Sequence, residues 1–160
     1  MQDQILQALR LRDADQAVQL ATRWIAAEPQ QPQTYRWHAL ALQQQGQLAA
    51  AVESLQRALE LAPDDADLHL QHAGLLLALH QFEDAEAALG RTTGFNPNEL
   101  SAYLMQAHLA LARNDVDEAE KQLKLASRVD AGNPEVVALS GMLALRRGAL
   151  DEALAQLSSA

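Results

Sequence analysis

The stretch RALELAPDD, residues 57–65, is typical of a helix that is about to end. Alanine and leucine form an apolar stripe that leads to Pro63, and two aspartates follow it. Proline stops a helix because it lacks a backbone N–H and its ring clashes with the preceding turn. Prolines also lie 34 residues earlier, at Pro29, and 34 residues later, at Pro97. The stretch therefore marks the end of a unit that the chain uses more than once.

Further sets of residues recur with the same spacing of 34. One set is alanine at every position: Ala17, Ala51, Ala85, Ala119 and Ala153. Because alanine fills 32 of the 160 positions, this set alone is only suggestive. Four residues after each alanine come Ala21, Leu55, Leu89, Leu123 and Leu157. Three residues before each come Ala14, Leu48, Phe82, Val116 and Leu150. Twelve residues before each come Ile5, Ala39, Ala73, Ala107 and Gly141. The agreement among these sets indicates an internal repeat.

Each unit has the pattern of two amphipathic helices. In residues 33–45, Tyr35, Ala39 and Leu42 fall on one stripe at helical spacing. A break is predicted after this helix, at the positions Gly46, His80, Asn114 and Gly148. Glycine and asparagine readily adopt the left-handed conformation that ends a helix, and His80 is the exception.

The second helix of a unit has its own start and stop signals. The residues Asp115 to Glu118 predict a capping box, in which each end of the motif bonds a free amide of the other. Pro63 or its equivalent then ends the helix. The small residues let the two helices approach closely, with Ala39 against Ala51 and Leu55.

This pattern resembles the tetratricopeptide repeat family. The best-matching unit carries Tyr35, His38, Ala39, Leu42, Ala51, Leu55 and Pro63. The next carries His69, His72, Ala73, Leu76, Ala85, Leu89 and Pro97. Two later units match less fully, from Tyr103 and from Val137, and a partial unit precedes them. The chain departs from the pattern at His38, His72, Gln106 and Ser140, where leucine is usual, and this puts the local packing in question.

The resemblance implies an all-α fold, a right-handed α-solenoid of about five antiparallel helix pairs. We expect a single domain over residues 1–160, with units of approximately 1–31, 32–65, 66–99, 100–133 and 134–160. Met1 shares the position of Tyr35, and Ala160 shares the position of Ala58, so the last helix stops before its usual proline turn. A stacked array normally carries a polar outer cap on its last repeat. We therefore expect a chain truncated at its C-terminus, with a complete small protein as the alternative. The uncapped last helix also predicts self-association or fraying at Leu150, Leu154 and Leu157.

The composition argues against several classes of protein. A formal net charge of −9 provides no basic face for DNA or RNA. There is no cysteine, which removes disulfides and thiolate metal sites. The N-terminus has no basic start followed by an apolar run, and uncharged stretches such as residues 68–82 are too short for membrane insertion. We expect a cytoplasmic protein. Ten arginines against two lysines, with abundant alanine, suggest a GC-rich bacterial genome.

The resemblance implies that the first helix of each pair lines a concave groove. The predicted partner-binding residues of this groove are Arg36, Trp37, Leu40, Leu70, Gln71, Leu104, Met105, His108 and Met142. A solvated face should be polar, whereas this one is mostly apolar, so it favours an apolar or helical partner. The alternative is that these side chains pack between neighbouring first helices. Trp37 and Met105 are the least easily explained in that way.

Other sites are weakly supported. One subset of the family clamps a chaperone carboxylate with lysine, asparagine and arginine, but the positions here hold Gln2, Leu6, Arg36, Trp37, Leu70 and Gln71. His38, His69 and His72 have no carboxylate beside them in a ligand pattern, so we expect buried or rim histidines, no metal and no cofactor. No phosphate loop, nucleophile elbow or paired carboxylates are present, so we expect no enzymatic activity in these residues.

The leading hypothesis is therefore a scaffold that binds a peptide or a partner helix. The alternative is a recruitment or regulatory arm of a larger enzyme, a transferase or hydroxylase, whose catalytic domain lies beyond residue 160.

Overall fold

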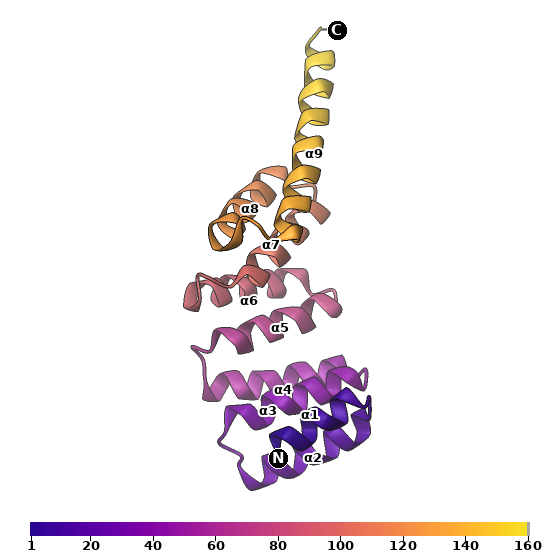
Figure 1. Cartoon of the computed structure of the whole chain (residues 1–160), viewed down its shortest axis with the longest axis vertical. Helices are drawn as coiled ribbons and strands as arrows, with labels where there is room; N and C mark the ends of the chain where they lie inside the picture. Colours follow the sequence, from indigo (N-terminus) through magenta and orange to yellow (C-terminus); the bar gives the residue numbers. More distant parts are fainter. Residues whose placement is uncertain (160) are drawn as a thin grey trace. The chain divides into compact units, whose positions relative to one another are not determined.

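The computed structural model of the chain describes residues 1–159, and every regular element within them is an α-helix (Figure 1). The helices of this part are α1 (Gln2–Arg10), α2 (Ala14–Ala27), α3 (Pro32–Gln44), α4 (Leu48–Leu61), α5 (Ala66–Ala78), α6 (Phe82–Phe95), α7 (Leu100–Ala112), α8 (Val116–Asp130) and α9 (Pro134–Ser159). Helices α1 to α8 pack as four consecutive pairs. The all-α prediction is confirmed for the described residues. The expectation drawn from Ala160 lies outside them.

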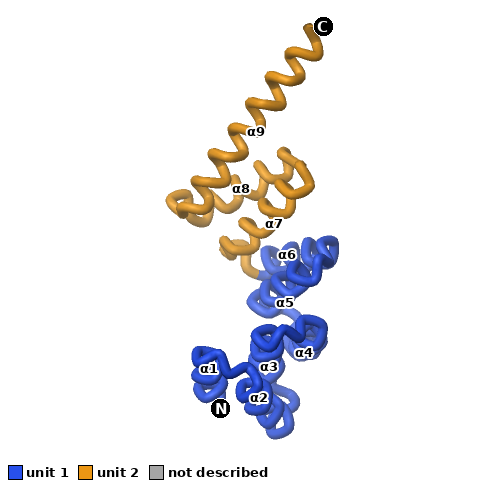
Figure 2. Tube along the Cα trace, turned by 90° about the vertical axis from the view of Figure 1, so that its right-hand side faces the viewer, with its two compact units in different colours: residues 1–95 blue, residues 96–160 orange. Residues whose placement is uncertain are grey.

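The chain divides into two compact units (Figure 2). Unit 1 comprises residues 1–95 and holds the pairs α1–α2, α3–α4 and α5–α6. Unit 2 comprises residues 96–160 and holds the pair α7–α8 together with α9.

The turn inside each pair repeats a single backbone device. Its central residue has a positive φ in all four pairs: Arg12 (58°), Gly46 (86°), His80 (59°) and Asn114 (58°). The next amide then donates back across the turn, as from Gln47 N to the Leu42 carbonyl at 2.9 Å. This bond closes the helix end as a Schellman motif. The breaks predicted at Gly46 and Asn114 are confirmed, and His80 adopts the same conformation although its residue type did not favour it.

Aspartates start several helices. The Asp13 and Asp115 carboxylates accept hydrogen bonds from the amides of Gln16 and Glu118, each at 3.1 Å. These bonds satisfy amides that have no partner inside the helix. The predicted capping box is only half formed, because the Glu118 carboxylate accepts a bond from Gln122 Nε2 at 2.7 Å instead of returning to the cap.

The proline turns between pairs are also fixed by side chains. Three side chains in equivalent positions donate to the carbonyl of the proline six residues earlier: Tyr35 to Pro29 (2.8 Å), His69 to Pro63 (2.7 Å) and Tyr103 to Pro97 (2.8 Å). The bond ties the first turn of a first helix to the loop before it. The position of Val137 continues this set but has no such donor.

The core of each pair is built on the small residues. The alanines of the four pairs, Ala17, Ala51, Ala85 and Ala119, are fully buried. Their counterparts on the first helices, Ile5, Ala39, Ala73 and Ala107, are fully buried as well. The predicted close approach of the two helices in each pair is therefore consistent with the structure.

The structure differs from the prediction at Gly148. Helix α9 runs without a break from Pro134 to Ser159, so the predicted turn at Gly148 is wrong for this structure and no fifth pair forms among the described residues. Glycine costs only about 1 kcal/mol relative to alanine in a helix interior, and good helix formers surround Gly148. Ala149 stands where Asp13 and Asp115 cap their helices, so a second helix would start there without a cap.

Candidate partner-binding faces

The predicted groove residues of unit 1 lie on α3 and α5. Arg36, Trp37, Leu40, Leu70 and Gln71 are all half-buried. Trp37 packs against the core cluster that α1, α2 and α3 form around Ile5, Ala8, Ala17, Ala21 and Ala41. Packing between neighbouring first helices therefore accounts for part of the Trp37 surface, as the alternative explanation held.

Polar groups on this face of unit 1 are incompletely paired. Gln71 Nε2 donates to the Arg36 carbonyl at 3.4 Å, which is a long hydrogen bond. Arg36 Nε is buried and has no hydrogen-bond partner among the described residues. This face therefore combines apolar surface with an unused donor.

In unit 2 the predicted residues have different environments. Leu104 is only 7% exposed and belongs to the core cluster with Leu139 and Leu143. Met105 is half-buried, whereas Met142 is 47% exposed. Leu104 thus supports the interior, and the methionines provide surface.

Polar contacts join α7 to α9. His108 Nε2 lies 2.9 Å from Glu135 Oε1, and both side chains are about half exposed. Arg146 Nη1 donates to the Leu111 carbonyl at 3.0 Å. The equivalent residue in unit 1, Gln44, donates to the Leu9 carbonyl at 2.8 Å. The sequence pattern does not single out Glu135. The equivalence of Gln44 and Arg146 in the repeat is a signal for the bond that Arg146 makes.

Two histidines of unit 1, His38 and His72, differ in their hydrogen bonding. His38 Nδ1 lies 2.8 Å from Ser54 Oγ, and burial lowers the pKa of His38. Both ring nitrogens of His72 are buried, and neither has a hydrogen-bond partner within residues 1–159. The pKa of His72 is lowered, first by burial and then by the nearby His69 and Arg91. Among residues 1–159, no group of three or more histidine or acidic side chains is placed to hold a metal ion.

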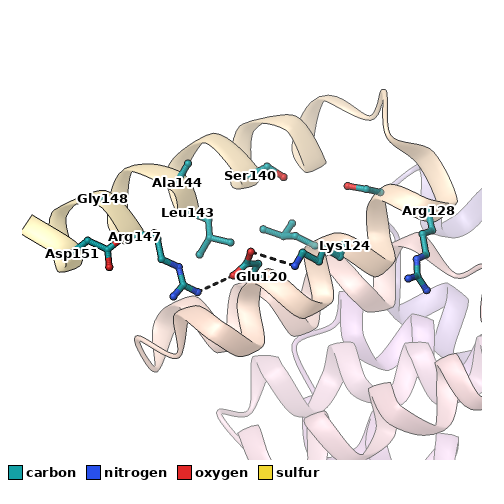
Figure 3. Close-up of a pocket in the computed structure, with 11 residues that line it drawn as sticks. Glu120, Lys124, Arg128, Ser140, Leu143, Ala144, Arg147, Gly148 and Asp151 are labelled. Carbon is teal, nitrogen blue, oxygen red and sulfur yellow. Dashed lines mark hydrogen bonds and ion pairs between the residues drawn. The ribbon is translucent and has the colours of Figure 1, made fainter.

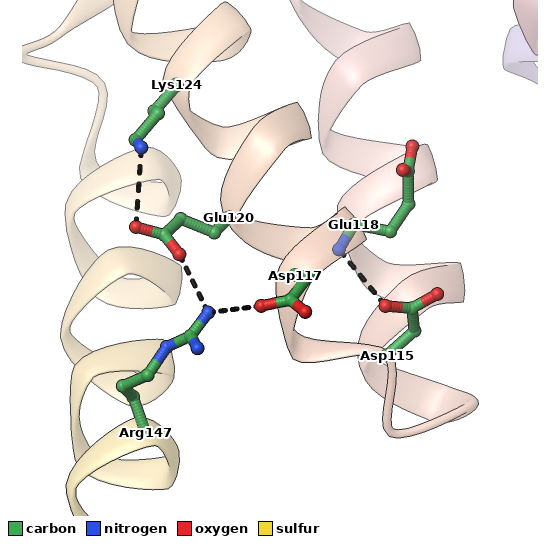
Figure 4. A network of polar contacts seen from close by, with 6 residues as sticks. All are labelled: Asp115, Asp117, Glu118, Glu120, Lys124 and Arg147. Atoms are coloured by element: carbon green, nitrogen blue, oxygen red, sulfur yellow. Dashed lines mark hydrogen bonds and ion pairs between the residues drawn. The ribbon is translucent and has the colours of Figure 1, made fainter.

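A hollow of about 740 Å³ opens between α8 and α9 in unit 2 (Figure 3). We call it the α8–α9 hollow; its lining residues are Glu120, Leu123, Lys124, Ser127, Arg128, Ser140, Leu143, Ala144, Arg147, Gly148 and Asp151. At one end Arg147 donates to Asp117 at 2.7 Å and to Glu120 at 2.8 Å (Figure 4). These ion pairs fasten α9 to the first turns of α8.

Family models match most of the chain. The tetratricopeptide repeat model matches residues 70–126 and again residues 104–160. The chain belongs to the tetratricopeptide repeat family. A second model, described as anaphase-promoting complex, cyclosome, subunit 3, matches residues 11–92. No curated protein sequence matches this tetratricopeptide repeat chain.

Solved tetratricopeptide repeat structures share the fold. MamA from Desulfovibrio magneticus RS-1, from its residue 41 to its end, superposes with a TM-score of 0.80 at 17% identity, over 99% of this chain and 89% of that MamA chain. PilF from Pseudomonas aeruginosa has a TM-score of 0.80 at 16% identity, over 89% of this chain and 65% of PilF. The first TPR domain of Spaghetti (RPAP3), bound to an HSP90 peptide, has a TM-score of 0.66 at 19% identity, over 76% of this chain and 94% of that domain. At these identities the likeness shows the fold alone, and it confirms the predicted α-solenoid.

These findings make the chain a tetratricopeptide repeat protein, and the family is one of protein-interaction scaffolds. In the part of the chain that the structure describes, no helix combines the length and the apolar character needed to cross a membrane.

Proposed function

We propose that this protein binds a peptide or a partner helix through the apolar faces of its first helices, by shape and burial and without chemistry of its own. Family membership supports the proposal, as does the peptide bound to the Spaghetti domain, a protein of the same fold. The face on unit 1 would use Arg36, Trp37, Leu40, Leu70 and Gln71. The face on unit 2 would use Met105, His108 and Met142, with Leu104 supporting them from the core.

The observation that carries the proposal is the apolar surface on α9. Met142 is 47% exposed and Leu145, one turn further on, is 78% exposed. Large exposed apolar side chains that gather on one element mark interaction surfaces. Methionine also adapts its shape to different partners. The His108–Glu135 pair, which joins α7 to α9, could orient a bound backbone through hydrogen bonds.

Peptide display selection on the purified chain tests the proposal. Binding of the selected peptide is then measured for Met142→Ala and Met105→Ala, and each should cost about 1–2 kcal/mol of affinity. Lys121→Ala is the matched control, since Lys121 is exposed on α8, a second helix. Affinity should change little between 50 and 300 mM salt, because apolar burial is not screened. Unchanged binding by both methionine variants would place the site elsewhere.

Trp37→Ala tests the face on unit 1 separately. Because Trp37 also packs against the core, the affinity must be compared with the melting temperature of the same variant. A loss of affinity at a temperature where the variant is fully folded would support a binding role for Trp37.

We also propose that copies of the chain self-associate weakly through the second half of α9. Leu150, Leu154 and Leu157 are 43%, 61% and 75% exposed there. Sedimentation over a hundredfold range of concentration should show an average mass that rises with concentration. A single monomer mass over that range would contradict this second proposal.

A further inference from the structure

The α8–α9 hollow has a smaller counterpart in unit 1, where α4 occupies part of the equivalent space. A smaller hollow of about 340 Å³ is lined there by Ile25 of α2 and by His38 and Leu42 of α3. Three repeats later, the equivalent residues are Ser127 of α8 and Ser140 and Ala144 of α9, which line the larger hollow. In unit 1 the remaining wall is α4, the second helix of the pair, through Ala50, Glu53, Ser54 and Arg57.

The segment equivalent to α4 in the last repeat is the second half of α9. Three repeats after Ala50 and Arg57 come Glu152 and Ser159. In this structure the segment continues straight along α9 and does not line the hollow beyond Asp151 (Figure 3). The α8–α9 hollow is therefore the position of a second helix that is not in place.

The two surfaces of α9 that would meet in a fifth helix pair are both exposed. On the first half of α9, Gly141 and Ala144 are exposed, whereas their equivalents Ala39 and Leu42 are buried by α4. On the second half, Ala153 and Leu157 are exposed, whereas Ala51 and Leu55 are fully buried.

The two surfaces point to different sides of the straight helix. Successive helical residues turn by about 100°, so Gly141 and Ala153, twelve positions apart, lie about 120° apart around the axis. One straight partner helix cannot cover both. A reversal of the chain between them brings the two surfaces face to face, as it does in α3 and α4.

Gly148 is placed for that reversal. The four equivalent residues, Arg12, Gly46, His80 and Asn114, all form the left-handed turn within a pair. Glycine adopts that conformation without strain. The ion pair between Arg147 and Asp117 is compatible with this reversal. The equivalent residues in unit 1, Gln45 and Asp15, form a hydrogen bond of 2.7 Å beside the turn that Gly46 closes.

We propose that α9 is a hinged lid, in which the helix breaks at Gly148 and residues 150–159 fold back over the α8–α9 hollow of the same chain. The straight helix is then the open state. Closure buries Leu157 and removes the surface that the proposed self-association needs, so the two processes compete. Ala149 provides no side-chain cap for the second half, but Gln47 provides none for α4 either, so a cap would favour closure without being required for it.

The closed state predicts one new contact that can be measured. His38 and Ser54 touch in the closed pair α3–α4, and their equivalents are Ser140 and Gln156. In the straight helix these two residues are sixteen positions apart, or about 24 Å. Since the chain has no cysteine, the double variant Ser140→Cys with Gln156→Cys reports on this pair alone. Both side chains are exposed in the open state, so the substitutions should not disturb folding.

The test combines oxidation and distance measurement on the whole chain. Under dilute oxidising conditions the double variant should form an intramolecular disulfide, and spin labels on the same cysteines should show a short distance besides that of about 24 Å expected for the straight helix. The matched control pairs Ser140→Cys with Ser158→Cys, whose equivalent Gln56 is exposed on the outer side of α4, and it should crosslink much more slowly.

Hinge variants make the test specific. Adding Gly148→Ala should slow the crosslink about fivefold or more, because alanine favours the helix and resists the left-handed turn. Adding Ala149→Asp should accelerate it by restoring a cap. Three outcomes would overturn the lid: spin labels that show no distance other than that of the straight helix, a control pair that forms its disulfide as fast as the test pair, or a disulfide between two chains. Such an interchain disulfide would leave self-association standing, whereas a monomer with an intramolecular disulfide would support the lid and limit self-association.

Discussion

His72 brings two ring nitrogens into the interior of unit 1, and neither has a hydrogen-bond partner among the residues that the structure describes. An unpaired buried polar group loses its bonds to water and gains nothing in return, at a cost of about 1–3 kcal/mol. The same position holds Gln106 in unit 2, where Oε1 is also buried and accepts no hydrogen bond from the described part of the chain. His38 avoids this cost through Ser54. The departures from leucine seen in the sequence therefore have different consequences from repeat to repeat.

Replacing His72 should stabilise the protein and change its response to pH. Burial lowers the pKa of His72, so the unfolded chain binds the proton more readily than the folded one. Stability is then full above a pH of about 6.5 and falls as the pH decreases from there towards the lowered value. We expect His72→Leu to raise the melting temperature at pH 7.5. It should also reduce the difference between the melting temperatures measured at pH 7.5 and at pH 5.5.

Gln106→Leu is the matched control for this effect. It removes an unpaired polar atom at the equivalent position but no titrating group. It should raise the melting temperature equally at both pH values. A pH response that is identical in His72→Leu and in the unmodified chain would show that His72 does not carry it.

Ala85 tests the close approach of α5 and α6. It is fully buried and belongs to the set of alanines that recurs every 34 residues. Ala85→Leu should therefore overpack the contact and cost about 1–3 kcal/mol of stability. Ala87→Leu, two residues further on the exposed side of α6, should have little effect. Thermal melts of both variants provide the measurement, and equal melting temperatures would mean that the repeat register is wrong.

At the scale of elements, the turn within each pair decides where helices end. Gly46 has a φ of 86°, and a Cβ atom added to it would meet no other atom within 4 Å, so backbone strain is the whole effect of adding a side chain. Gly46→Ala should cost about 1 kcal/mol. Gly90→Ala, inside α6 and equally uncrowded, should instead stabilise by up to about 1 kcal/mol. The denaturant concentration at the midpoint of unfolding should therefore fall for Gly46→Ala and rise for Gly90→Ala.

The ends of several helices could be predicted because the residue types there have a clear preference. Proline follows α2, α4 and α6, and Gly46 and Asn114 favour the left-handed turn after α3 and α7, whereas Arg12 and His80 adopt that turn without such a preference. Helix α9 could not be predicted in this way. Glycine suits both a helix and a left-handed turn, so the local sequence at Gly148 leaves the choice to packing further along the chain.

The candidate site was less predictable than the fold. A first helix has neighbours on more than one side, and helical spacing does not tell which side is covered. Spacing therefore put Leu104 and Met142 in one set, although the structure buries the first and exposes the second. The same limit applies to Trp37, which an apolar cluster on α1 and α2 partly covers.

At the scale of the whole molecule, stability should add up from neighbouring pairs. In repeat proteins each repeat contacts only its neighbours, so a fragment that ends after a complete pair keeps the contacts inside it. Unit 1 contains its own core clusters around Leu55 and around Ile5, and it ends with the pair α5–α6 complete. Residues 1–95 should therefore fold alone.

Two fragments of unit 1 test this additivity. Residues 1–95 should show the circular dichroism of a helical protein and a cooperative melt. Residues 1–80 lack α6, the helix that pairs with α5, and so expose Ala73 and Leu76, which are buried in the whole chain. Because 1 kcal/mol shifts the melting temperature of a domain of this size by roughly 4–8 °C, the shorter fragment should melt at least about 5 °C lower. Hydrogen exchange should locate the loss in α5 and leave α1 to α4 protected. Equal melting temperatures, or a loss spread evenly over all helices, would mean that unit 1 behaves as one indivisible core and not as a sum of pairs.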